Sequence, residues 1–178
     1  SAPFTVQTLD DNLAEVTETY SVSITGATGA QFEAVAIDGS LNVVHTNILE
    51  NDTPSLSIND VTVNEDAGTM TFTVTLSNPS TLEVTVDYIS DGTEGTATEN
   101  VDYDAVNGSL TFAPGVLTQT ITVPITDDYI AEGSETFDMI LSNATNATIA
   151  DTTGLGQILD EPTPGNEDTV NVTLAGDT

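Results

Sequence analysis

The chain has 178 residues, 29 Asp and Glu side chains, no Lys or Arg, and a formal net charge of -29. DNA, RNA and bare membrane surfaces are excluded as partners, because binding to phosphates and anionic lipids depends on Lys and Arg. The absence of cysteine excludes disulfides, thiol catalysis and thiolate metal sites.

Apolar and polar residues alternate with a period of two in short runs along the chain, and no stretch keeps a helical period for three turns. The runs mix Val, Ile, Thr, Phe and Leu with polar neighbours, and turn sequences such as Asn78-Pro79 and Asn107-Gly108 separate them. In chain order, the expected strands cover residues 4–9, 18–25, 41–49, 55–58, 61–64, 69–76, 82–89, 109–113, 118–125, 135–141, 155–159 and 169–174. This pattern predicts an all-β fold of antiparallel sandwiches.

One acidic sequence occurs twice. Residues 10–20 and 127–137 share the pattern Asp-Asp-x-(Leu/Ile)-Ala-Glu-x-(Thr/Ser)-Glu-Thr-aromatic, and residues 47–54 are similar to 157–162. One repeat is therefore about 110 residues long, the size of a single sandwich domain. The period predicts one complete module at residues 54–162 and the C-terminal half of an earlier module at residues 1–53. Residues 163–178 are then a Pro/Gly linker and the first strand of a following module.

The clustered acids need a cation from outside the chain. Two like charges about 4 Å apart repel by roughly 4 kcal/mol at an effective dielectric constant of about 20, which is a large share of a domain's stability. Calcium is the favoured ion, because it accepts about six to eight oxygen ligands in irregular geometry, whereas magnesium keeps its waters and zinc prefers nitrogen and sulfur.

Several motifs of the complete module occur in a characteristic order. They are Val-Asn-Glu-Asp-Ala-Gly at 63–68, Gly-Thr-Ala-Thr at 95–98, Asp-Tyr at 102–103, Gly-Ser-Leu-Thr-Phe-Ala-Pro-Gly at 108–115, Asp-Asp at 127–128 and Ile-Leu-Asp at 158–160. In this combination the chain resembles a Calx-β domain over about 110 residues. Residues 1–53 resemble the closing half of a related module, of the kind strung in tandem in giant secreted bacterial adhesins. The resemblance implies a seven-stranded, immunoglobulin-like sandwich that binds calcium at one tip.

The resemblance also implies two sets of calcium ligands. In the complete module they are Glu65, Glu94, Asp102, Asp127, Asp128, Glu132, Glu135, Asp160, Glu161 and the carbonyl of Ile130. In the partial module they are Asp10, Asp11, Glu15, Glu18, Glu50, Asn51, Asp52 and the carbonyl of Leu13. Asp91 competes with Glu94 for one position, and Glu94 is preferred because it preserves the spacing to Asp102; Asp104 is a candidate extra ligand. Independently of the family, adjacent Asp127 and Asp128 can reach one tip only if the chain turns there.

No catalytic site is expected, because the chain has no Gly-rich phosphate loop, no nucleophile elbow and no sign of an aromatic-lined cleft. The only histidine, His45, lies in an alternating strand without a second imidazole or a thiol beside it. With no apolar run of 18 residues, no membrane insertion is expected.

The expected function is that of a calcium-stiffened spacer module in a long extracellular bacterial adhesin or surface filament. Its partners would be calcium, neighbouring modules or copies of the same chain, and glycans or proteins of a host or biofilm. Three alternatives stay open: a calcium-dependent sugar- or peptide-binding module, an accessory domain beside a secreted hydrolase, and a filament subunit whose residues 169–174 insert into the incomplete sheet of another chain.

Overall fold

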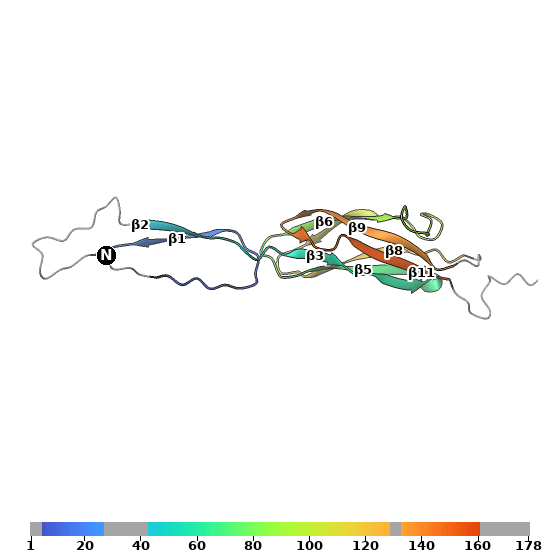
Figure 1. The fold of residues 1–178 in the computed structure, drawn as a ribbon, viewed down its shortest axis with the longest axis horizontal. Helices are drawn as coiled ribbons and strands as arrows, with labels where there is room; N and C mark the ends of the chain where they lie inside the picture. Colours follow the sequence, from blue (N-terminus) through green and yellow to red (C-terminus); the bar gives the residue numbers. More distant parts are fainter. Residues whose placement is uncertain (1–4, 27–42, 129–132, 161–178) are drawn as a thin grey trace, which may run out of the picture.

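The computed structural model describes residues 5–26, 43–128 and 133–160, and in them the protein is built from β-strands (Figure 1). Two sheets pack face to face into a sandwich. One sheet has the order β10-β3-β5-β8 and the other β4-β11-β9-β6-β7. The strands of the first sheet are β3 (Ser55–Ile58), β5 (Thr69–Leu76), β8 (Thr118–Pro124) and β10 (Thr148–Ile149). Those of the second are β4 (Val61–Asn64), β6 (Val84–Asp91), β7 (Asn107–Phe112), β9 (Glu135–Thr145) and β11 (Thr153–Leu159).

The sandwich confirms the predicted fold class. If β3 and β4 are taken as two halves of one strand that changes sheets at Asn59 and Asp60, and the two-residue β10 is left aside, the described part of the sandwich has seven strands. Most neighbours are antiparallel, but β4 runs parallel to β11 and β10 runs parallel to β3. The 3-10 turn η1 (Glu65–Ala67) follows β4 and ends at Gly68, whose φ of 70° is the left-handed conformation that glycine adopts without strain.

The core lies between the sheets and follows from the alternation in each strand. Along β5, every second residue from Met70 to Leu76 is buried. Phe137 of β9 lies within this core, stacked on Tyr103 at a ring distance of 4.1 Å and edge-on to Phe72 at 6.0 Å. All three rings are fully buried, so this aromatic group fixes the spacing of the two sheets at one end of the sandwich.

A two-stranded hairpin precedes the sandwich and lies end to end with it (Figure 1). It consists of β1 (Glu18–Ser23) and β2 (Val43–Ile48). Its register is that of β9 and β11, because Glu18 pairs with Ile48 as Glu135 pairs with Ile158, and the other five pairs match in the same way through Ser23 with Val43 and Ile140 with Thr153. The strand pairing thus agrees with the sequence repeat residue for residue.

The prediction of a strand at residues 4–9 is wrong for the described part, residues 5–9, which pair with no other strand and are exposed. In the repeat these residues correspond to 122–126, and Thr122 and Val123 of β8 pair with β5. The hairpin has no described counterpart of β5, so alternation alone did not produce a strand there. The strand expected at residues 169–174 lies outside the described residues.

In the described parts of the chain, no helix is long and apolar enough to cross a membrane.

Candidate metal centres

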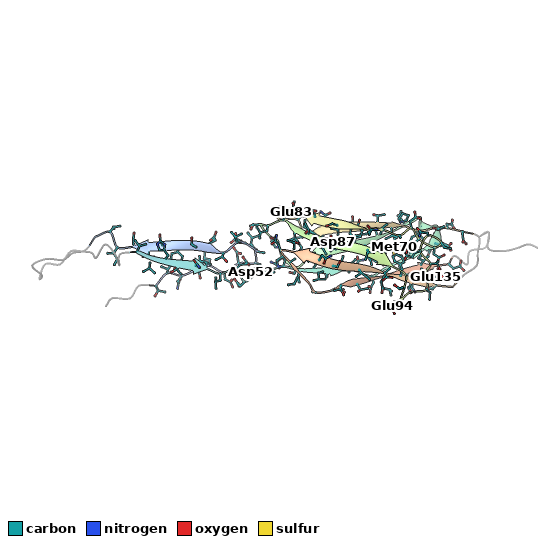
Figure 2. The ribbon with its side chains drawn as sticks, turned by 90° about the horizontal axis from the view of Figure 1, so that it is seen from above. Asp52, Met70, Glu83, Asp87, Glu94 and Glu135 are labelled. Atoms are coloured by element: carbon teal, nitrogen blue, oxygen red, sulfur yellow. The ribbon has the colours of Figure 1, made fainter. Side chains whose placement is uncertain are left out.

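The first cluster of predicted ligands lies where the hairpin meets the sandwich, at the place of Asp52 in Figure 2. Two segments form it, the loop before β1 and the chain after β2. Within the loop, the Asp11 carboxylate accepts a hydrogen bond from the Leu13 amide at 2.9 Å, which closes a tight turn directly after the acidic pair Asp10 and Asp11. The turn keeps both carboxylates at the hairpin's end.

Glu50 ties the two segments of this junction cluster together. Its Oε2 accepts a hydrogen bond from the Glu15 amide at 2.6 Å, and its Oε1 accepts one from the Asp52 amide at 2.5 Å. A second contact between the segments is the hydrogen bond that the Asn51 side-chain amide donates to the Asp10 carboxylate at 3.3 Å. One carboxylate therefore holds two backbone amides that come from opposite sides of the cluster.

The eight predicted ligands of the partial module all line one hollow of about 100 Å³. They are Asp10, Asp11, Leu13, Glu15, Glu18, Glu50, Asn51 and Asp52. Burial first, and then the charges of Asp11, Glu18 and Glu50, raise the pKa of Glu15 above its ordinary value; burial and neighbouring acids raise the pKa of Asp52 in the same way. The cluster thus concentrates negative charge with no base beside it, and each polar side chain lining the hollow offers oxygen.

The same loop contacts the sandwich through Ala14. The Ala14 amide donates to the Pro79 carbonyl at 2.9 Å, and the Ala14 carbonyl accepts from the Thr81 amide at 2.8 Å, which makes a parallel bridge to Ser80. Ala14 is 5% exposed, and a second tie runs from the Asn78 side-chain amide to the Asp52 carbonyl at 2.6 Å. Sequence reasoning missed this docking contact, since an alanine between Leu13 and Glu15 carries no signal of its own.

The second cluster lies at the opposite end of the sandwich. Glu65 of η1 accepts a hydrogen bond from the Asp128 amide at 2.9 Å, so the first strand of the module and the acidic pair after β8 meet there. Asp102 is 8% exposed; its Oδ2 accepts from the Thr98 amide at 2.5 Å, and its carbonyl accepts from the Thr126 amide at 2.9 Å. Asp102 therefore links the long loop after β6 to the acidic pair.

Glu94 and Glu135 lie toward this far end of the sandwich (Figure 2). The loop that carries Glu94 is fixed by Gly95, since a Cβ there would lie 1.9 Å from the Thr136 carbonyl oxygen. The amides of Thr96 and Ala97 both donate to that oxygen at 2.9 Å.

The alternative ligand Asp91 is turned onto Thr93. It accepts hydrogen bonds from the Thr93 hydroxyl and, at 2.8 Å, from the Thr93 amide. These bonds hold the pKa of Asp91 below its ordinary value. Asp104 is exposed. Ile130, Glu132 and Glu161 lie outside the described residues.

Calcium fits the chemistry of both clusters, since their donors are carboxylate, amide and carbonyl oxygens. Among the described residues, however, no group of three or more His, Asp or Glu side chains is arranged to hold a metal ion. At the junction cluster, Glu50, Asp11 and Asp10 accept hydrogen bonds from amide donors. Each carboxylate keeps further lone pairs that could bind an ion.

Comparison with known proteins identifies the family. The Calx-beta domain profile matches residues 49–173, most of the chain, and the chain therefore belongs to this family. Calx-β domains are non-catalytic β-sandwich modules that typically bind calcium.

Solved structures agree with this assignment. The chain is 25% identical to the apo form of the Calx CBD1 domain, with a TM-score of 0.57, over 61% of this chain and 98% of that one. It is 26% identical to the CBD12 structure of CALX1.2, with a TM-score of 0.56, over 60% of this chain and 45% of that one.

A curated relative is the Adhesion G-protein coupled receptor V1 of Danio rerio, which is 40% identical over 88 residues. The match covers 49% of this chain but 1% of the receptor, so the chain spans a very small part of that protein's length.

Proposed function

We propose that this chain is a calcium-stiffened spacer of a long extracellular protein, a bacterial adhesin or surface filament, in which ions at the module ends fix the angle between successive modules. The observation that carries the proposal is the double role of the loop before β1. It supplies acids to the junction cluster, and through Ala14 it docks on the next module. Any ion that orders this loop also orders the contact between modules.

The residues that would hold the ion at the junction are Asp10, Asp11, Glu15, Glu18, Glu50 and Asp52, with the carbonyl of Leu13. A bound calcium ion would supply the positive charge that this hollow lacks. The chain's own residues do the positioning: Glu50 bridges the two segments, and the Ala14 main chain holds the loop against residues 79–81. Extracellular calcium modules typically bind at about 10⁻⁴ to 10⁻³ M, which matches the calcium concentration outside cells.

Calcium-dependent stability tests the proposal at the level of the fold. At a free calcium concentration about 100 times Kd, binding to the folded state adds about 2.7 kcal/mol, which for a sandwich of this size raises Tm by about 10 °C. Differential scanning calorimetry with calcium and then with excess chelator measures the shift. An unchanged Tm would contradict calcium binding.

The hinge is tested separately by small-angle X-ray scattering and residual dipolar couplings. Calcium should narrow the range of angles between hairpin and sandwich, and the double variant Glu18→Gln with Asp52→Asn should remove this effect. Within the described residues, neither of these carboxylates accepts a hydrogen bond, so the variant takes away charge and leaves the ties through Glu50 in place. Glu83→Gln, an acid outside both clusters, is the matched control. If calcium raises Tm but leaves the angle distribution unchanged, the module binds calcium without acting as a stiffener.

A calcium-dependent sugar- or peptide-binding module is the second candidate, favoured by a hollow of about 390 Å³ over the loop after β6. Its lining, from Asp91 to Glu99, contains no aromatic side chain, and sugar sites usually stack their ligand on one. A glycan array in calcium would favour this candidate if binding disappeared in Asp102→Ala. Sequence beyond this chain would decide whether a secreted hydrolase adjoins it. The remaining alternative, a filament subunit assembled by strand exchange, would place an inserted strand against the apolar face of the hairpin.

A further inference from the structure

The turn after β5, residues 77–81, contacts both chain segments of the junction cluster. Its Pro79 carbonyl and Thr81 amide hold Ala14 of the loop before β1, and the Thr81 hydroxyl donates a further bond to the Ala14 carbonyl at 3.1 Å. On the other side, the Asn78 side-chain amide donates to the Asp52 carbonyl at 2.6 Å. One short turn of the sandwich therefore holds the two segments that supply the acids at the end of the hairpin.

The side chain of Asn78 is oriented by its own neighbours. The Ser77 hydroxyl accepts a hydrogen bond from the Ser55 amide at 2.9 Å and donates its proton to Oδ1 of Asn78 at 2.6 Å. Because Oδ1 is taken by Ser77, the amide nitrogen of Asn78 is the group that faces the Asp52 carbonyl, as a carbonyl acceptor requires. The proline that follows Asn78 also restricts its backbone. The donor toward Asp52 is thus fixed before any ion binds.

The main chain of Asp52 is held at both of its polar groups. Its carbonyl accepts from Asn78, and its amide donates to the Glu50 carboxylate at 2.5 Å. The same carboxylate accepts from the Glu15 amide of the other segment at 2.6 Å. Asn78 is therefore connected to both acidic segments through Asp52 and Glu50, although it lies outside the lining of the hollow that these described residues form.

We propose that Asn78 of the sandwich is a positioning residue for the metal centre at the end of the preceding hairpin. It holds the Asp52 main chain and so sets the place of the Asp52 carboxylate. The junction metal centre is then built by two successive modules, and its affinity for calcium depends on the side chain that the following module carries after β5. This inference rests on the proposed function, because it assigns Asn78 to the metal centre named there.

The variant Asn78→Asp separates positioning from simple electrostatics. The carboxylate has nearly the shape of the amide, but it adds a negative charge and has no proton to donate to the Asp52 carbonyl. If charge alone governed the affinity, an extra acid beside the junction would strengthen calcium binding. The loss of one positioning hydrogen bond predicts the opposite result, a calcium midpoint about 3- to 10-fold higher at the junction.

A calcium titration of the whole chain, followed by amide NMR shifts, measures the midpoint of each cluster separately. The amides of Glu15 and Asp52, which donate to Glu50, report on the junction. Those of Thr98 and Asp128, which donate to acids of the far cluster, give an internal reference in the same sample. The substitution at residue 78 should raise the midpoint at the junction and leave the far midpoint unchanged.

Asn146→Asp is the matched control. The Asn146 side-chain amide also donates to a main-chain carbonyl, that of Glu83, at 2.8 Å, but it bonds to neither acidic segment. The same substitution there should not raise the junction midpoint. A second pair of variants tests the orientation of Asn78: Ser77→Ala removes the hydroxyl and should raise the junction midpoint, whereas Ser77→Thr keeps a hydroxyl and should restore the wild-type value.

Three results would overturn the role of Asn78: an unchanged junction midpoint in Asn78→Asp, a lowered one, or an equal rise in Asn146→Asp. Each of them would leave calcium binding at the junction intact. A wild-type chain whose junction amides do not respond to calcium would instead contradict the proposed function, and this inference with it.

Discussion

Gly95 shows how one missing side chain positions a predicted ligand. Its Cα lies against the backbone of β9, and an added Cβ would sit 1.9 Å from the Thr136 oxygen, which cannot move without breaking the sheet. Gly95→Ala should therefore lower the free energy of unfolding by about 1–3 kcal/mol. Gly133→Ala is the matched control, because no atom lies within 4 Å of its added Cβ, and it should change stability by less than about 0.5 kcal/mol. Urea titration of both variants measures the difference; equal effects would contradict the close approach.

The junction cluster makes a second prediction, about protonation. The pKa of Glu15 lies above its ordinary value of 4.5, and that of Asp52 above 3.8, through burial and neighbouring acids. An acid with a raised folded pKa favours folding once the pH falls below that pKa, and the contribution is lost as the pH rises through it. Without calcium, the junction should thus become more stable as the pH falls from neutral toward these ordinary values.

Carbon-detected NMR titration of the side-chain carboxyls checks this expectation. Glu18→Gln should lower the pKa of Glu15, because it removes one of the charges that raise it. Asp91 provides an internal control in the same sample, since its hydrogen bonds to Thr93 lower its pKa. If the pKa values of Glu15 and Asp91 departed from their ordinary values in the same direction, this result would contradict the charge argument.

At the scale of strands, the two copies of the repeat allow the same position to be compared in a packed core and in the hairpin. Phe137 and Tyr20 hold equivalent places in β9 and β1, but Phe137 is fully buried against Tyr103 and Phe72, whereas Tyr20 is only half-buried. Phe137→Ala should cost about 3–5 kcal/mol, and Tyr20→Ala should change the stability of the sandwich by less than about 0.5 kcal/mol. Chemical denaturation followed by far-UV circular dichroism measures both, and a comparable loss in Tyr20→Ala would mean that the hairpin is part of the same folding unit.

Sequence predicted the strands well where a partner strand exists. Alternation found the runs that became β5, β8 and β9, and the acidic repeat aligned β1 and β2 with β9 and β11 in the correct register. It failed at residues 5–9, because a strand needs a neighbour that alternation cannot show. The ties from Glu50 to Glu15 and from Ala14 to Ser80 were out of reach for a similar reason: they join residues 35 or more positions apart, and nothing local marks an alanine as a docking residue.

For the whole molecule, the absence of any Lys or Arg leaves 29 acids without an internal counter-charge, and the clusters account for only some of them. The remaining acids repel one another over the surface, and this repulsion weakens the folded state whether or not the clusters hold calcium. Monovalent salt should therefore weaken the repulsion among acids over the whole surface, whereas calcium should act on the acids of the two clusters.

In excess chelator, raising the sodium chloride concentration from about 0.01 M to about 1 M shortens the screening length from about 30 Å to about 3 Å, so Tm should rise steadily with salt. In saturating calcium the same increase in salt should give a smaller rise, because the closest carboxylates would already be neutralised by the ions. The variant with Glu18→Gln and Asp52→Asn separates the two effects: it should reduce the response to calcium while leaving most of the response to salt, since it removes two of 29 acids. Calorimetry over a grid of salt and calcium concentrations measures both responses. Calcium at about a thousandth of the sodium chloride concentration should raise Tm further than sodium chloride does. An equal rise in Tm from sodium chloride would mean that the acids act as a general charged surface and that the two clusters have no special role as metal centres.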